Sequence, residues 1–242
     1  MTPARAGLRT GAVLVGAAAT LHAAPALSAV APLRNNLMPR LAGRGRPGHI
    51  ALTFDDGPDH AGTPGFLDLL DARGVRATFF LLATMAIRSP GVAKDIAAAG
   101  HEIALHGWHH RPLLLCGPRS THDGLARARD TLAAITGTPP AYFRPPYGIM
   151  TASAHHACRR LNLDPVLWTA WGKDWRGRST PGSIHDAVTR GLGSGGTILL
   201  HDSDCTSAAG SWRRTLAALP RILDTCQARG WSVGPLRDHG VR

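Results

Sequence analysis

The chain contains 242 residues, of which 44% are hydrophobic, so it has enough apolar material for a folded core and is not a wholly disordered protein. This length fits a single domain built as an α/β barrel or an open sheet. The 27 basic residues exceed the 16 acidic ones by 11, and six of these 11 charges lie in the acid-free segment 1–48. The remaining excess forms no run, which argues against a nucleic-acid-binding groove.

The N-terminus has the features of an export signal. Arg5 and Arg9 precede a short apolar stretch, 11–21, and small residues of the Ala-x-Ala type follow at 24–31. The stretch is shorter than the roughly 20 residues of a membrane span. We therefore expect residues 1–31 to be a signal peptide or an uncleaved membrane-anchoring signal. The protein is expected to be exported, secreted or held at the cell surface, and to contact a membrane only through that signal.

Residues 32–48 are rich in Arg, Gly, Pro and Asn and are expected to form a linker or an arm wrapped on the surface. A single domain is expected over residues 49–242, because short β-branched and aromatic runs alternate there with helical stretches. The predicted strands are His49–Phe54, Ala77–Leu82, Glu102–His106, Ala141–Arg144, Pro165–Thr169, Thr197–His201 and Trp231–Leu236. The predicted helices are Gly65–Arg73, Val92–Ala99, Thr121–Ile135, Ala152–Leu161, Ser183–Leu192 and Arg213–Arg229. This alternation indicates parallel βαβ units, arranged as a barrel or an open sheet.

Four cysteines are dispersed along the chain: Cys116, Cys158, Cys205 and Cys226. They are too few for a disulfide scaffold, and none has the Cys-x-x-Cys spacing of a zinc knuckle or a thioredoxin-like site. In an exported protein they could form one or two bridges. The alternative is that they are buried as small apolar side chains.

Polar residues collect directly after several predicted strands, where parallel α/β folds build their sites. The first cluster is TFDDGP, in which Asp55 and Asp56 precede a Gly57-Pro58 turn. Adjacent strand residues point to opposite faces, so both carboxylates can serve one site only if the chain turns there. The same pattern is also typical of a purely structural Asp-Gly-Pro turn with a helix cap.

The second cluster, HGWHH, has the spacing of metal ligands. His106 and His110 are four residues apart, and a helical turn would place both imidazoles on one face. His106 with His109 would also fit, and a solvated histidine-rich loop is the alternative. One aspartate with two histidines makes an open divalent metal site, with positions left for water and substrate.

Three further clusters follow strands later in the chain. The segment FRPPYG places Arg144 before a proline-stiffened loop, which could equally be a rigid turn that packs an aromatic. The segment WTAWGKDW brings three tryptophans close to Asp174, a density found in cores and also in sugar-stacking clefts. The segment ILLHD ends an apolar strand on His201.

Taken in this order, the five clusters resemble the motifs of the polysaccharide deacetylases, carbohydrate esterase family 4 with its NodB homology domain. The resemblance covers about residues 49–236, and TFDDGP is a highly specific motif. It implies a single-domain α/β fold, a distorted (β/α)7 barrel, preceded here by the N-terminal signal segment and arm. The seven strands predicted from the residues alone agree with that fold.

The resemblance also implies a role for each matching position. Asp55 would be the general base, oriented by Arg144, and His201 would be the general acid, paired with and tuned by Asp174. A divalent metal, usually zinc, would be held by three ligands: Asp56, His106 and His110. The substrate would be contacted by the oxyanion-binding backbone N–H of Tyr147 and by two pocket residues, Trp175 and Leu199.

Two positions depart from the family pattern. The second motif usually carries a serine or threonine after its first histidine, and Gly107 stands there instead. Because that hydroxyl supports the loop and does not bind metal, we expect metal binding to persist with a looser loop. The fourth motif often begins with an acid or amide three residues before Asp174, where this chain has Trp171, so the geometry of the sugar subsite stays open.

The expected activity is removal of N-acetyl groups from a glycan that contains N-acetylglucosamine, such as peptidoglycan or chitin fragments, with release of acetate. The partner is thus a polysaccharide or oligosaccharide, and no nucleic-acid partner is expected. Two alternatives stay open: an O-acetyl esterase acting on acetylated xylan, and a catalytically inactive barrel that binds carbohydrate. The intact set of base, metal ligands and acid argues against the inactive barrel.

Overall fold

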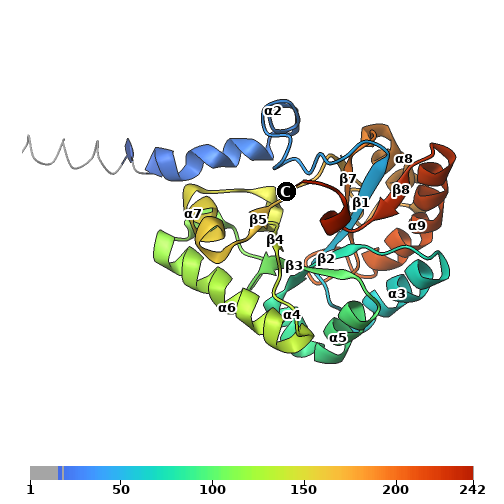
Figure 1. The fold of residues 1–242 in the computed structure, drawn as a ribbon, viewed down its shortest axis with the longest axis horizontal. Coiled ribbons are helices and arrows are strands. Elements are labelled where there is room, and N and C mark those ends of the chain that lie inside the picture. Colours follow the sequence, from blue (N-terminus) through green and yellow to red (C-terminus); the bar gives the residue numbers. More distant parts are fainter. Residues whose placement is uncertain (1–15, 18, 242) are drawn as a thin grey trace, which may run out of the picture.

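The computed structural model describes residues 16–17 and 19–241, and its centre is a curled sheet of parallel strands wrapped by helices (Figure 1). The strands are β1 (His49–Asp55), β2 (Thr78–Leu82), β3 (Glu102–Gly107), β4 (Tyr142–Phe143), β5 (Asp164–Pro165), β6 (Ala170–Trp171), β7 (Thr197–His201) and β8 (Ser232–Gly234). They run in the order β5-β4-β3-β2-β1-β7-β6, and β8 pairs with the first half of β1. The predicted α/β barrel is confirmed. It is distorted because β4, β5 and β6 contain two residues each.

Helices follow the strands and cover the outer face of the sheet (Figure 1). They are α3 (Thr63–Ala72), α4 (Ala83–Arg88), α5 (Pro90–Ala98), α6 (Pro118–Thr136), α7 (Ala152–Leu161), α8 (Pro181–Gly191) and α9 (Ser211–Ala228). A proline in the first turn begins α3, α5, α6 and α8, where its fixed φ and missing N–H are tolerated. Six of these helices match predicted ones, whereas α4, which directly continues β2, was not predicted.

Alternation along the strands decides which side chains reach the inside of the barrel. Phe54 of β1 belongs to the large apolar cluster between the sheet and the helices, whereas Ala51 belongs to a smaller cluster inside the barrel. Because side chains alternate with a period of two, Asp55 shares the inner face with Ala51. The same alternation places His106 of β3 and His201 of β7 on the inner face, at the carboxyl ends of their strands.

The structure contradicts one predicted strand, Pro165–Thr169. Only Pro165 lies in a strand, as the last residue of β5, and residues 166–169 form the irregular connection to β6. The carbonyls of Val166 and Leu167 accept hydrogen bonds from the Arg144 side chain at 3.1 and 2.8 Å, and the Leu167 N–H donates to Leu41 in the arm at 2.7 Å. Backbone groups that are satisfied in this way are no longer free for a strand ladder.

The predicted arm packs on the barrel and contains a helix that the sequence did not indicate, α2 (Ala31–Leu37) (Figure 1). Arg34 of this helix is 2% exposed. Its guanidinium donates to the carbonyls of Ser28 and Trp168, both at 2.9 Å. Ser28 lies in a short 3-10 helix, η1 (Ala24–Ala29). Because a buried guanidinium requires such partners, Arg34 ties the arm to the segment that precedes β6.

Much of the predicted export signal lies outside the described residues, namely 1–15 and 18, which include Arg5 and Arg9. The signal and its boundary at residue 31 therefore stay predictions. No helix in the part of the chain that the structure describes has both the length and the apolar character needed to cross a bilayer.

The four cysteines are all free thiols. Cys158 and Cys226 are buried, and both pack in the large apolar cluster. Burial raises the pKa of the Cys226 thiol to about 11, because it disfavours the thiolate. These two cysteines thus behave as small apolar side chains, one of the two possibilities that the sequence left open.

A buried histidine pair joins the arm and the C-terminus to the start of β1. The Nδ1 atoms of His49 and His239 lie 2.8 Å apart, and His239 Nε2 lies 3.1 Å from the carbonyl oxygen of Gly43. Both imidazoles are buried, with Arg46 and Asp238 as their charged neighbours. Since one Nδ1 must accept the proton that the other donates, the contact requires at least one neutral imidazole.

We expect protonation of this pair to destabilise the fold. Burial and His49 lower the pKa of His239 from 6.5 to about 4, so the unfolded chain binds the proton first as pH falls. Stability is full above pH 6.5 and is lost towards pH 4, and this group should contribute about 1–2 kcal/mol of that loss between pH 7 and pH 5. Urea denaturation at both pH values should show a smaller loss for His239→Gln. Equal losses in the variant and the parent would contradict the assignment.

Candidate active site and metal centre

A pocket of about 290 Å³ opens at the carboxyl ends of the strands, and the predicted site residues gather there. Eight of them line it: Asp55, Asp56, His106, His110, Tyr147, Trp175, Leu199 and His201. The other two, Arg144 and Asp174, are fully buried. The structure therefore brings together residues that the sequence spreads over about 150 positions.

Three side chains converge as a candidate metal centre. The Nε2 atoms of His106 and His110 lie 3.3 and 3.7 Å from Oδ1 of Asp56, and the possible ligand atoms all lie within 4.8 Å of one another. Oδ1 of Asp56 is buried and has no hydrogen-bond partner. His106 Nδ1 lies 2.7 Å from the backbone oxygen of Arg144, which leaves Nε2 free. This donor set, with an orphaned carboxylate oxygen facing two imidazoles, fits a divalent ion.

The charges of the ligands also suit a cation. Burial alone would raise the pKa of Asp56, but the neighbouring histidines, above all His106, hold it far below its ordinary value. Burial lowers the pKa of His110, which favours its neutral form. Metal ligation requires an ionised carboxylate and neutral imidazoles, so the pKa values of Asp56 and His110 are shifted towards the forms that bind. Burial would lower the pKa of His106, but Asp55 and Asp56 raise it, so this ligand releases a proton when an ion binds.

The structure decides between the two histidine pairs that the spacing allowed. His110 belongs to the cluster, whereas His109 is exposed and makes an edge contact with Trp108. The expected helical turn is wrong, because β3 ends at Gly107 and the next residues form bends. Gly107 has a φ of 116°, a conformation that L side chains rarely adopt, and this turns the chain back towards the pocket.

The loop that carries His110 is anchored from another element. The backbone N–H and the hydroxyl of Thr84, in α4, donate to the carbonyl of Trp108 at 3.2 and 3.0 Å. On its other side, the Arg127 guanidinium stacks 3.6 Å from the centre of the Trp108 ring. These contacts hold the loop although Gly107 offers no hydroxyl, and the looser loop stays a prediction.

The two adjacent carboxylates reach the same pocket because the chain turns at Asp56, whose φ is 78°. Asp55 Oδ1 accepts a 2.7 Å hydrogen bond from the buried Arg144 guanidinium, and Oδ2 lies 3.9 Å from His106 Nε2. Arg144 also donates to the hydroxyl of Thr53 at 2.8 Å. Asp55 is thus held by one oxygen, while the other faces the candidate metal centre.

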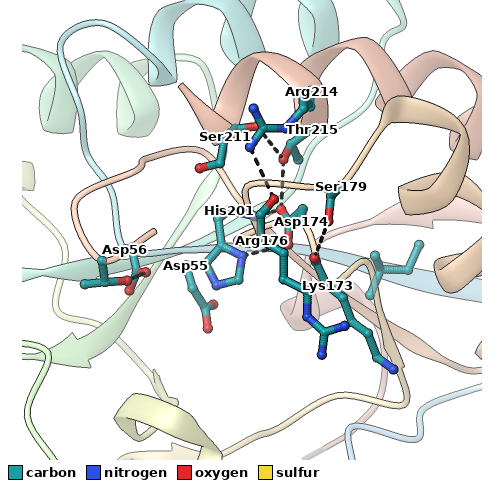
Figure 2. A network of polar contacts seen from close by, with 12 residues as sticks. Asp55, Asp56, Lys173, Asp174, Arg176, Ser179, His201, Ser211, Arg214 and Thr215 are labelled. Atoms are coloured by element: carbon teal, nitrogen blue, oxygen red, sulfur yellow. Dashed lines mark hydrogen bonds and ion pairs between the residues drawn. The ribbon is translucent and has the colours of Figure 1, made fainter. Parts of the chain in front are cut away.

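His201 and Asp174 form a second pair, in which Asp174 is fully buried and the His201 side chain is 12% exposed (Figure 2). Asp174 Oδ1 lies 2.9 Å from His201 Nδ1, and Oδ2 accepts from the His201 N–H and from the Thr215 hydroxyl at 2.8 and 2.9 Å. Burial opposes protonation of His201, but Asp174 outweighs it and raises the pKa to about 10. With Nδ1 occupied by Asp174, Nε2 is the nitrogen available to a substrate.

Thr206, which lies outside the motifs, supports a site carboxylate, and Asp202, the last residue of ILLHD, packs behind the Gly57 turn. The Thr206 hydroxyl donates a short hydrogen bond to Asp56 Oδ2, which turns Oδ1 towards the histidines. Asp202 accepts from the Thr63 hydroxyl and lies so close to Gly57 that a Cβ there would be 2.5 Å from its carboxylate. Thr206 lies in a loop of irregular structure, so no sequence period marked it.

Aromatic rings form the opposite wall of the pocket. Trp171 lies between Trp168 and Trp175, with ring centres 5.6 and 6.1 Å away. Tyr147 has a φ of 61° and is 56% exposed at the rim, in contact with the His110 ring. Trp171 stands where the family often has an acid or an amide. It thus adds an apolar surface beside the acid–base groups, of the kind that packs on a sugar ring.

The sequence profile, the similar proteins and the similar structures all point to one protein family. The sequence profile described as polysaccharide deacetylase matches residues 42–166, which include the first three polar clusters. A chitooligosaccharide deacetylase from Bradyrhizobium sp. (strain ANU 289) is 34% identical over 77% of this chain and 88% of its own length. The peptidoglycan-N-acetylglucosamine deacetylase PgdA of Listeria monocytogenes is also 34% identical, over 66% of this chain.

The chain spans only 34% of the length of the Listeria protein. Among solved structures, a family 4 acetyl xylan esterase from Clostridium thermocellum, in complex with a cobalt ion, superposes with a TM-score of 0.70 and 28% identity. That match covers 78% of this chain and 89% of the esterase. The chain belongs to the polysaccharide deacetylase family, carbohydrate esterase family 4.

Proposed function

We propose that this protein is a metal-dependent hydrolase that removes N-acetyl groups from a glycan containing N-acetylglucosamine, such as peptidoglycan or chitin fragments, and releases acetate. One observation carries the proposal: an Asp-His-His cluster lies in one pocket between Asp55, held by Arg144, and His201, held by Asp174. The names of the similar deacetylases support an N-acetylated glycan as substrate.

The metal would be held by Asp56, His106 and His110, and we propose zinc because two imidazoles and one carboxylate suit a catalytic zinc site with an open position. When bound, such an ion polarises a carbonyl oxygen and lowers the pKa of water. The backbone N–H of Tyr147 is assigned to the oxyanion of the tetrahedral intermediate, and Trp175 and Leu199 to the methyl side of the acetyl group.

Each of two pairs, Asp55 with Arg144 and His201 with Asp174, carries out one proton transfer. Asp55 accepts a proton from the attacking water at its free oxygen, while Arg144 keeps the other oxygen in place. As the C–N bond breaks, His201 donates the proton on Nε2 to the leaving nitrogen, and Asp174 stabilises the imidazolium beforehand. The products are acetate and a free amine, so water and the amide balance the reaction.

O-acetyl ester hydrolysis is the second candidate, since the similar Clostridium structure is an acetyl xylan esterase. An alkoxide leaves more readily than an amide nitrogen, so an ester needs the protonated His201 less. Asp174, which accepts a hydrogen bond from the Thr215 hydroxyl, supports the protonated His201, and this support favours an amide substrate. A barrel that only binds carbohydrate would need neither of the two buried pairs.

We further propose that the protein is exported and acts at the cell surface or in the medium. The proposal rests on Arg5 and Arg9, the apolar stretch 11–21 and the small residues after it. A glycan polymer of the cell wall lies outside the membrane, so export and the proposed substrate are consistent.

The metal assignment predicts about one divalent ion per chain in the purified protein. His110→Ala should lose most of this metal, because it removes one of three ligands. His109→Ala, in the same loop, is the matched control and should keep the metal, because its ring is exposed. Metal content measured by mass spectrometry decides the point. Loss from His109→Ala with retention in His110→Ala would reverse the assignment.

Thr206 should tune the affinity for this metal through Asp56. Thr206→Val keeps the shape of the side chain but removes the hydroxyl that holds Asp56 Oδ2. We expect zinc affinity, measured by competition with a chelator, to fall roughly 10- to 100-fold, as for other residues that support metal ligands. Thr206→Ser should stay near the parent value. Equal affinity in Thr206→Val and the parent would show that Asp56 needs no such support.

The role of His201 predicts a difference between two substrates. His201→Ala should slow hydrolysis of an N-acetylated chitooligosaccharide by roughly 10²- to 10⁴-fold, the usual effect of a lost acid. It should retain far more activity on nitrophenyl acetate, whose leaving group needs no proton. Asp55→Asn, which keeps an acceptor for Arg144, should impair both reactions. Equal losses on both substrates for His201→Ala would mean that His201 supports the metal or the fold. The absence of acetate release from any N-acetylated glycan would refute the proposed function.

A further inference from the structure

A second, open groove adjoins the active-site pocket. It is lined by Trp175, Arg176, Gly177, Arg178, Thr206, Ser207 and Ala208. Three of these residues, Trp175, Thr206 and Ser207, also line the active-site pocket, so the two hollows are continuous. A glycan with its N-acetyl group in the pocket would lay a neighbouring sugar, or a substituent of that sugar, along this groove.

The arginines of the groove have no acidic partner in the part of the chain that the structure describes. Among the described residues, neither Arg176 nor Arg178 forms an ion pair or a side-chain hydrogen bond, whereas Arg73 and Arg129 elsewhere have aspartate partners. The Arg176 guanidinium lies 5.0 Å from the centre of the Trp175 ring. It points away from the hydrogen-bonded network of its own loop (Figure 2).

The acidic groups nearest in the chain are turned to other partners. Asp174 is buried and engages His201 and Thr215. Asp204, on the loop that forms the opposite wall, accepts a 2.6 Å hydrogen bond from the Gly210 N–H and is not part of the lining. Lys173 adds a further exposed cation on the same loop. The lining of the groove thus contains two arginines and no acidic residue, whereas Asp55 and Asp56 lie in the adjoining pocket.

The backbone that presents these arginines is held firmly. The Arg176 carbonyl accepts from the Ser179 N–H at 3.1 Å and from the Arg214 side chain at 3.3 Å. The Ser179 hydroxyl donates to the Lys173 carbonyl at 2.8 Å (Figure 2). Across the groove, the Ala208 N–H donates to the Trp175 carbonyl at 3.0 Å, which ties the two walls together. A site built in advance loses less entropy on binding.

We propose that this groove is a carboxylate subsite, in which Arg176 and Arg178 bind an acidic substituent next to the sugar that is deacetylated. Guanidinium groups match the planar geometry of a carboxylate and form charge-assisted hydrogen bonds with it. The protein then prefers N-acetylated glycans that carry carboxylates over neutral ones. This inference rests on the proposed function and specifies its substrate class. The carboxylate can belong to the sugar itself or to a short peptide attached to it.

The test compares kcat/KM for acetate release from three substrates: peptidoglycan strands with their peptides, the same strands after enzymatic removal of the peptides, and a neutral chitooligosaccharide. Arg176→Gln/Arg178→Gln is the test variant. Arg160→Gln, at the C-terminal end of α7 and exposed, removes one charge remote from the site and serves as control. Circular dichroism and thermal unfolding verify that each variant is folded.

We expect the ratio of acidic to neutral kcat/KM to fall roughly 10-fold in the double variant, mainly through KM, and to stay at the parent value in the control. In the parent, 0.5 M salt should reduce the same ratio, because salt screens exposed charges. Retention of the preference on peptide-free strands places the carboxylate on the sugar, and its restriction to intact strands places it on the peptide.

A ratio that salt leaves unchanged, or that is the same in the double variant and the control, overturns the subsite but leaves the deacetylase function intact. If the double variant does not fold, the effect of salt on the kcat/KM ratio of the parent protein still tests the subsite. Release of acetate from none of the three substrates overturns the proposed function, and the subsite with it.

Discussion

The active-site half of the barrel depends on one buried cation, Arg144. Its guanidinium is fully buried and bonds to Asp55, to the Thr53 hydroxyl and to the carbonyls of Val166 and Leu167. It therefore joins β1 to the irregular segment between β5 and β6, where no strand ladder is present. A buried charge left without its partner costs several kcal/mol, so the orientation of Asp55 and the course of that segment are coupled.

Asp55 and Asp56 have the same side chain, but the fold places them in different surroundings. A positive φ at Asp56 turns the chain, so that both carboxylates enter one pocket although they are adjacent in sequence. Arg144 holds Asp55, whereas Thr206 and two imidazoles surround Asp56. His201 is held in a similar way, because its Nδ1 atom contacts Asp174. Asp55 and His201 are thus each oriented by a fully buried partner, Arg144 and Asp174, that is not part of the pocket lining.

The rim of the pocket differs in character from its floor. Rings of Trp168, Trp171 and Trp175 make an apolar wall, and the unpaired Arg176 and Arg178 follow directly beyond Trp175. Under the proposed function, the pairs on the floor serve the chemistry, which any N-acetyl group shares. The residues of the rim are then assigned to recognition of the rest of the glycan.

Much of the fold and the site was readable from the sequence, because periodicity and motif residues are local. Alternating runs predicted the parallel strands. The polar clusters after them, together with the family resemblance, gave ten candidate site residues, all of which lie in or directly behind one pocket. The spacing alone left His109 and His110 open, and the structure places His110, the ligand that the family resemblance implied, beside His106. Only the tertiary structure decided that Arg144 replaces a strand ladder at residues 166–167 and that Thr206 holds Asp56. Each of these contacts joins residues whose spacing in the chain says nothing of their distance, or depends on a turn such as that at Gly107, so only the packed barrel determines them.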